Sequence, residues 1–140
     1  TGIAYIPSPG TYKACFAFID DIVNGHLLAM EKGIHGEKYI LGGVNISYRD
    51  FFEQIRSIAS CTGHIIPLPK NIIKGWGLLQ QLNYRITGRQ PLFTAKGAEI
   101  IFSNYTFSSE KASAKFNYSI TPLEEALNKT IQFFKTKNYA

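Results

Sequence analysis

The stretch ACFAFIDDIVNGHLLAMEKG, residues 14–33, decides how the fold is interpreted, because its pattern changes from that of a strand to that of a helix. Ala14 to Ile19 is a compact aromatic and apolar run whose length suits a buried strand. Asp20 and Asp21 can then accept hydrogen bonds from the free N–H groups of a helix start and face its positive dipole end. Apolar residues follow at helical spacing up to a glycine stop (Ile22, Val23, Leu27, Met30, Gly33). The stretch therefore predicts a buried strand that leads directly into a helix.

Short strands and helices are expected on either side of this stretch. Residues 1–10 predict a strand followed by a turn, and residues 38–41 and 64–68 predict two more strands. Ser47 and Asp50 have the spacing of a capping box, which predicts a helix that ends at Gly63.

Helices dominate the rest of the chain. The sequence predicts helices over residues 71–84, from Thr94 to Phe102, and from Ser108 or Ser109 to near Phe116, with a short β-like stretch at residues 105–107. The last helix is predicted from three signals: Thr121 as the N-cap, Pro122 in the first helical position, and Glu124 completing a capping box. These strands are too few for an independent sheet, so we expect them to extend a sheet formed by sequence outside this chain.

Composition places the chain among single globular domains. Its 140 residues are 45% hydrophobic and only 18% charged, which suggests that a partner domain covers part of the surface. The net charge of +5 is compatible with an anionic partner, either nucleic acid or a phosphorylated ligand. The basic residues lie apart along the chain rather than in a run, so we do not expect a nucleic acid to be a partner.

The cysteines and the lengths of the apolar runs indicate where in the cell the protein is expected. Cys15 and Cys61 are too few and too isolated for a disulfide framework, which favours a reduced, cytoplasmic protein. No apolar run approaches the roughly 20 residues of a membrane span, so we expect no membrane partner.

Familiar catalytic patterns are missing from the sequence. Gly75 and Gly77 lack a third glycine and the preceding strand that a dinucleotide-binding loop requires. No tyrosine is followed by a lysine four positions later, a pair that would lower the pKa of the phenol. The three histidines do not have metal-ligand spacing, and no GxSxG occurs. We therefore assign no catalytic, cofactor-binding or metal-binding residue within these 140 residues.

Three residues are candidates for substrate binding. Arg85 and Arg89 flank Gly88, and two guanidinium groups on a loop could grip a carboxylate or phosphate, although they could equally be solvated charges. Phe18 could line a pocket, with packing in the core as the alternative.

Several segments in order resemble one family. These are residues 16–23, FAFIDDIV; 25–33, GHLLAMEKG; 36–43, GEKYILGG; 66–69, IPLP; 88–94, GRQPLFT; 109–112, SEKA; and 121–127, TPLEEAL. Together they resemble the C-terminal half of extended short-chain dehydrogenases/reductases (SDRs), the NAD-dependent epimerase/dehydratase family. The nearest group is the one of dihydroflavonol-4-reductase-like proteins and hopanoid-associated sugar epimerases.

The resemblance implies an α/β fold in which residues 1–140 form the C-terminal, mostly helical substrate-binding part and the main Rossmann domain lies outside the chain. The implied protein is an NAD(P)-dependent reductase or epimerase that acts on a carbonyl or sugar-like substrate. Its implied partners are its own N-terminal Rossmann domain, a small-molecule substrate and, in the full-length protein, a second copy in a homodimer. A non-catalytic regulatory or binding module with the same fold is the alternative.

The resemblance also implies roles for individual positions. Asp21 matches a near-universal aspartate with a structural role, and Phe18 stands where many relatives place a substrate-facing His or Asp. The family's diphosphate-binding arginines are replaced here by Ala14 and by Ser103-Asn104. These replacements argue against a nucleotide-sugar substrate.

Overall fold

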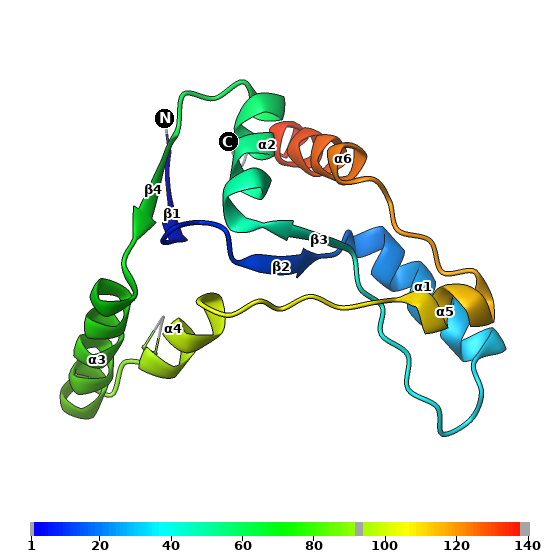
Figure 1. Cartoon of the computed structure of the whole chain (residues 1–140), viewed down its shortest axis with the longest axis horizontal. Helices are drawn as coiled ribbons and strands as arrows, with labels where there is room; N and C mark the ends of the chain where they lie inside the picture. Colours follow the sequence, from blue (N-terminus) through cyan, green and yellow to red (C-terminus); the bar gives the residue numbers. More distant parts are fainter. Residues whose placement is uncertain (1, 92–93, 138–140) are drawn as a thin grey trace.

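The computed structural model describes residues 2–91 and 94–137 (Figure 1). The elements follow in the order β1 (Ile3–Pro7), β2 (Lys13–Phe16), α1 (Ile19–Lys32), β3 (Val44–Ser47), α2 (Tyr48–Ala59), β4 (His64–Leu68), α3 (Lys70–Thr87), α4 (Ala95–Ile101), α5 (Glu110–Phe116) and α6 (Leu123–Thr136). Helix predominates over short strands, which confirms the expected fold class.

The first and last strands form one incomplete sheet. β1 and β4 are parallel, with Ile3 opposite His64 and Pro7 opposite Leu68. Helix α2 packs against β1. Ile3 and Tyr5 are exposed, at 57% and 60%, whereas Ile6 is fully buried. Parallel strands are otherwise found in larger sheets with both faces covered, so this pair has the form of a sheet fragment.

The second pair of strands corrects one prediction. β2 runs antiparallel to β3, from Lys13 opposite Ser47 to Phe16 opposite Val44. The predicted strand at residues 38–41 is wrong: these residues lie outside any strand, and pairing begins at Val44. At Gly43 the chain passes so close to β2 that an added Cβ would lie 2.0 Å from the Phe16 carbonyl oxygen. Regular pairing therefore starts only beyond that close approach.

The prediction of a strand followed directly by a helix at residues 14–33 is confirmed in outline, but its details are wrong. Strand β2 ends at Phe16 and is half-buried rather than buried, and Ile19 already belongs to α1. The side chain at the N-cap, Phe18, makes no capping hydrogen bond. The apolar stripe of α1 is exposed by 51 to 79% at Ile19, Val23, Leu27 and Met30. Gly33 is the predicted C-cap, although its φ of −68° is not left-handed.

The predicted helix caps are confirmed where the hydrogen-bond partner lies a few residues away in the chain. Ser47 Oγ accepts from the Asp50 N–H at 3.1 Å and donates to the Asp50 carboxylate at 2.6 Å. Helix α2 ends at Ser60 in the left-handed conformation, not at Gly63. Helix α3 is longer than predicted, and α4 starts at the predicted Thr94 cap.

Helix α5 has its N-cap at the predicted Ser109, although without a side-chain cap bond, whereas α6 begins differently from the prediction. The N-cap of α6 is Pro122 rather than Thr121, and no side-chain cap bond forms there. Ser109 Oγ accepts from the Gly42 N–H at 2.8 Å instead of capping α5, while Ser108 Oγ accepts from the Glu110 N–H at 3.3 Å.

The core is small for a chain of this size. Its buried cluster comprises Ala112, Phe116 and Tyr118, against which Tyr39 and Leu41 pack. The chain exposes 9870 Å². A compact monomer of 15.7 kDa exposes about 7,300 Å². The excess of about 2,600 Å² supports the expectation that another domain completes this fold.

Candidate functional site

The carboxyl ends of β1 and β4 define one edge of the sheet fragment. Because the strands are parallel, Pro7 and Leu68 reach this edge side by side, and the Ser8 N–H donates to the Leu68 carbonyl at 3.0 Å. In open α/β sheets, ligands bind in the crevice outside these ends. The segments that leave this edge, the turn after β1 and helix α3 after β4, therefore frame the candidate site.

The turn after β1 is held rigidly by Arg49. The Arg49 guanidinium donates to the Pro9 carbonyl at 3.0 Å, and the Arg49 N–H donates to the Gly10 carbonyl at 3.1 Å. Gly10 has a φ of +93°, and a Cβ there would lie 2.8 Å from Ile6 Cδ1. The bonds from α2 thus fix a backbone turn that a larger residue at Gly10 would disrupt.

An aromatic pair joins three segments beside this edge. Tyr12 packs edge-on against Phe102, with ring centroids 5.6 Å apart, and Phe102 is only 7% exposed. The Lys70 ammonium lies 5.9 Å from the Phe102 ring centroid while Lys70 itself is exposed. This arrangement places a cation next to an apolar wall, which suits a ligand with an anionic group.

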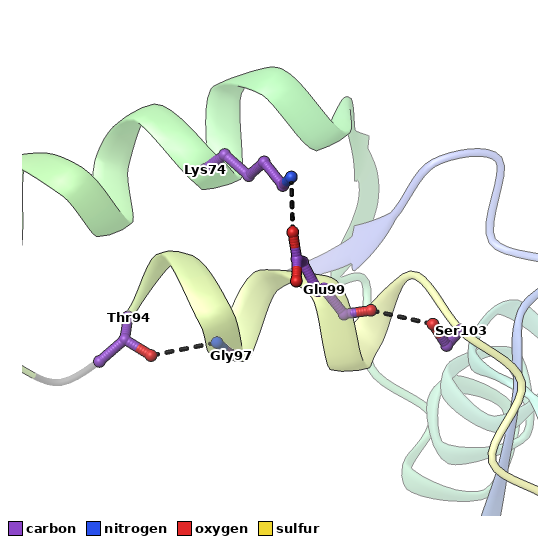
Figure 2. A network of polar contacts seen from close by, with 5 residues as sticks. All are labelled: Lys74, Thr94, Gly97, Glu99 and Ser103. Carbon is purple, nitrogen blue, oxygen red and sulfur yellow. Dashed lines mark hydrogen bonds and ion pairs between the residues drawn. The ribbon is translucent and has the colours of Figure 1, made fainter.

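Helices α3 and α4 form a hairpin that packs together beyond the same edge. Figure 2 shows its polar contacts: Lys74 Nζ pairs with Glu99 Oε1 at 2.8 Å, and Thr94 Oγ1 accepts from the Gly97 N–H at 3.0 Å. The Ser103 hydroxyl donates to the Glu99 carbonyl at 3.0 Å (Figure 2). The hydrogen bond from Lys74, followed by its charge, lowers the pKa of Glu99. We refer to residues 70–101 as the α3–α4 hairpin.

The structure separates the three predicted substrate-binding residues. Phe18 is half-buried at the start of α1, and the Lys129 ammonium of α6 lies 5.7 Å from its ring centroid. Arg85 lies in the last turn of α3, not on a loop, and Arg89 follows the Gly88 C-cap. Helices α1 and α3 lie at opposite sides of the molecule (Figure 1). Arg85 and Arg89 are thus near one another in the chain, and Phe18 does not join them.

Both guanidinium groups are exposed and available. In the described part of the chain, neither Arg85 nor Arg89 has a carboxylate within 4.0 Å. Gly88 ends the helix in the left-handed conformation, with φ +70°, and its N–H donates to the Tyr84 carbonyl at 2.8 Å. The two side chains could therefore bind an anion without breaking an existing ion pair.

Two asparagines were not anticipated as organising residues. The Asn45 side chain donates to the Phe107 carbonyl at 2.8 Å and accepts from the Phe107 N–H at 3.1 Å. Asn104 Oδ1 accepts from the Lys13 N–H at 2.9 Å, and Ala14 forms a parallel bridge with Tyr105. Residues 104–107 therefore lie along β2 and β3, as the predicted β-like stretch suggests. A carboxamide that mimics backbone pairing leaves no periodic signal in the sequence.

The described residues contain no cluster of metal ligands, and two of their tyrosines have raised pKa values. They contain no group of three or more His, Cys, Asp or Glu side chains that could hold a metal ion. Tyr118 donates its hydroxyl to the Gly42 carbonyl at 2.8 Å in a buried position, and desolvation, with added effects of Asp21 and Cys15, raises its pKa. Desolvation also raises the pKa of Tyr48. A raised pKa opposes proton transfer by either phenol near neutral pH.

Comparison with known proteins identifies the fold. No family model matches the chain. It is 24% identical to a 3β-hydroxysteroid dehydrogenase/decarboxylase of Arabidopsis thaliana, over 93% of this chain and 33% of that protein. The solved structure of gox2253 matches with a TM-score of 0.71 and 28% identity, over 98% of this chain and 40% of that one. A UDP-glucose 4-epimerase of Thermotoga maritima matches with a TM-score of 0.69 and 21% identity, over 96% and 35%.

These matches, with the incomplete parallel sheet, show the fold of the C-terminal, mostly helical part of a Rossmann-type extended short-chain dehydrogenase/reductase. The solved structures it matches include members of the NAD-dependent epimerase/dehydratase family, as the resemblance in the sequence implies. The chain spans 33 to 40% of the length of the relatives described above.

Proposed function

We propose that this chain is the substrate-facing part of an NAD(P)-dependent reductase or epimerase whose cofactor is bound by a Rossmann domain that precedes it. The observation that carries the proposal is the parallel β1–β4 pair. Its apolar residues Ile3 and Tyr5 are exposed, and a larger sheet with covered faces would bury them. The matched epimerases and dehydratases, several crystallised with NAD, support this class of cofactor. A carbonyl or sugar-like substrate fits the chemistry that a nicotinamide performs.

Within this chain, we assign substrate binding to the carboxyl edge of the sheet fragment. Arg85 and Arg89 supply positive charge from the end of α3, the helix that leaves this edge, and Phe18, which lies at the start of α1 on the opposite side of the molecule, is not assigned to this site. Closure of the missing domain over β1 would bring cofactor and substrate to this edge, because ligands of open α/β sheets bind there. The protein would then act mainly by orienting the substrate against the cofactor.

Calorimetry on two forms of the protein tests the proposal. The complete protein is expected to bind NAD(H) or NADP(H) with micromolar affinity, while residues 1–140 alone show no binding. Micromolar binding by the isolated chain would contradict the assignment of the cofactor to another domain. Retained cofactor binding without turnover of any carbonyl substrate would instead favour the non-catalytic alternative.

Steady-state kinetics test the residues. Arg85→Ala and Arg89→Ala in the complete enzyme are each expected to raise KM about tenfold or more with a smaller effect on kcat, since each removes a charged binding contact. Lys38→Ala is the matched control, because Lys38 is an exposed cation far along the chain from the hairpin. Unchanged kinetics in both arginine variants would remove them from the substrate site.

A further inference from the structure

The positive charge of the chain is concentrated in one segment. Residues 54–98 contain six basic residues and no acidic residue, whereas the remaining residues carry nine basic and ten acidic residues. The net charge of +5 therefore comes entirely from a segment that includes β4, α3 and the first half of α4. Within it, Lys70, Arg85, Arg89 and Lys96 are exposed.

The same segment exposes a broad apolar face. Six large side chains of α3 are each 56 to 77% exposed: Ile72, Trp76, Leu78, Leu79, Leu82 and Ile86. At 100° per residue these six positions share one side of the helix, while the buried Gly77 lies on the other, toward α4. The face runs for about 21 Å along the helix, longer than the contact of a single small substrate requires.

The charges decide what covers this face. The α3–α4 hairpin carries five basic residues and one acidic residue, Glu99, which pairs with Lys74, so two copies of the chain would bring two net positive surfaces together and like charges oppose self-association through α3. An anionic lipid surface matches both features, since acyl chains accept the apolar face and headgroups accept the surrounding cations. Trp76 has the amphipathic ring that favours the interface between headgroups and acyl chains. The hairpin also protrudes from one end of the molecule, beyond β4 (Figure 1).

We propose that the α3–α4 hairpin docks on an anionic membrane surface, with α3 lying in the plane of the interface and its apolar face among the upper acyl chains. The described residues contain no helix that is long and apolar enough to cross a membrane. A helix that lies on a membrane surface needs only one apolar face with flanking cations. The absence of a long apolar run, from which we expected no membrane partner, therefore does not exclude surface docking. Docking would set the carboxyl edge of the sheet next to the lipid. The proposal stands independently of the proposed function.

Vesicle co-sedimentation of the complete protein tests the docking. Vesicles of phosphatidylcholine with about a third phosphatidylglycerol are expected to bind the protein at least tenfold more tightly than phosphatidylcholine alone, with the difference shrinking as salt is raised. Leu79→Ser/Ile86→Ser should weaken binding to the anionic vesicles about 30-fold or more, because both side chains leave the acyl region. Both are largely exposed, at 61% and 77%, so the fold should tolerate the change.

A charge variant and its control separate lipid docking from general electrostatics. Lys70→Gln/Lys96→Gln should weaken binding to anionic vesicles about 30-fold and leave binding to neutral vesicles unchanged. Lys38→Gln/Lys135→Gln removes the same charge from exposed sites outside the hairpin and should leave both unchanged. Wild-type affinity in Leu79→Ser/Ile86→Ser, or no preference of the wild type for anionic vesicles, would overturn the proposal. Because turnover of a soluble substrate should persist in Leu79→Ser/Ile86→Ser, loss of docking is distinguishable from loss of the proposed catalytic function.

Discussion

The Asp21 side chain on helix α1 holds the segment that leads into α6, and removing it should strongly lower the stability of both helices. It is 7% exposed, and its carboxylate accepts from the Thr121 N–H at 2.7 Å and from the Thr121 hydroxyl at 2.6 Å. The contact joins residues 100 positions apart, immediately before α6 begins. Asp21→Ala would remove both bonds and leave a half-buried backbone donor, the Thr121 N–H, without its partner.

The expected loss follows from the number and type of these bonds. Hydrogen bonds to a charged group contribute about 1.5–3 kcal/mol each, so the loss of two in Asp21→Ala should lower the local stability of α1 and α6 by about 3–6 kcal/mol. Asp21→Asn keeps an acceptor for the Thr121 N–H and should cost roughly half as much. Asp20→Asn is the control: Asp20 is exposed, accepts no hydrogen bond within the described residues, and has a similar position relative to the helix dipole.

Amide hydrogen exchange, followed by mass spectrometry on the complete protein, measures this local stability. Exchange in the first turns of α1 and α6 should accelerate on the order of a hundredfold or more in Asp21→Ala, because 1.4 kcal/mol corresponds to a factor of ten. It should change by only a few-fold in Asp20→Asn. Equal acceleration in Asp21→Ala and Asp20→Asn would refute the reasoning, because the effect would then come from the helix dipole and not from Thr121.

Two further perturbations test close approach and charge pairing. Gly43→Ala should destabilise the complete protein by about 3 kcal/mol or more, because the new methyl would lie 2.0 Å from the Phe16 carbonyl oxygen. Gly75→Ala should stabilise it by up to about 1 kcal/mol, because Gly75 lies inside α3 and its added Cβ would meet nothing within 4 Å. A thermal melt that ranks the two variants in the reverse order would contradict this. Glu99→Gln should destabilise the hairpin at neutral pH. Because the pKa of Glu99 is lowered by Lys74, the bond between them stabilises the hairpin fully above pH 4.5, and this stabilisation is lost as pH falls through the lowered pKa. The difference in exchange rates of hairpin amides between wild type and Glu99→Gln should therefore be present at neutral pH and disappear once pH falls below the lowered pKa of Glu99, and a difference that does not change with pH would exclude the ion pair as its cause.

The accuracy of the sequence predictions depends on how local the deciding contact is. Ser47 and Thr94 were identified as caps because each bonds a backbone N–H only three residues away. Asp21 was assigned the same kind of local role, and its partner lies 100 residues along the chain. Thr121, predicted as a cap, is the other half of that bond. Competition from a distant partner therefore explains both misassigned caps.

Strand prediction failed for a related reason. Residues 38–41 have the apolar character of a strand, but Leu41 and Tyr39 pack against the cluster around Phe116 instead of pairing with a strand. The residues that do pair, Val44–Ser47, include Asn45, a residue with low strand propensity that is held by its two bonds to Phe107. Burial and side-chain pairing, neither of which has a period in the sequence, decided these assignments.

The candidate site was only partly accessible to the same reasoning. Arg85 and Arg89 were predicted together from their spacing around Gly88, but Arg85 lies in the last turn of α3 and not on a loop. Their separation from Phe18 depends on how α1 and α3 leave different strands, which a single sequence does not reveal. The Tyr12–Phe102 pair joins segments 90 residues apart, so nothing in either local sequence could indicate it.

Two surfaces of this chain leave apolar side chains exposed to a similar degree, and their charges assign them to different partners. The stripe on α1 lies on a helix with three acidic residues and one lysine, Lys32, so an anionic membrane would repel it. The face on α3 lies in the α3–α4 hairpin, which has five basic residues and one acidic residue, Glu99, paired with Lys74. Exposed apolar area alone would make both surfaces contacts for the Rossmann domain that we propose. Because the electrostatic cost differs in sign, we propose a protein domain as the partner of α1 and a lipid surface as the partner of α3. Helices α1 and α3 lie at opposite sides of the molecule, so the two contacts would not compete (Figure 1).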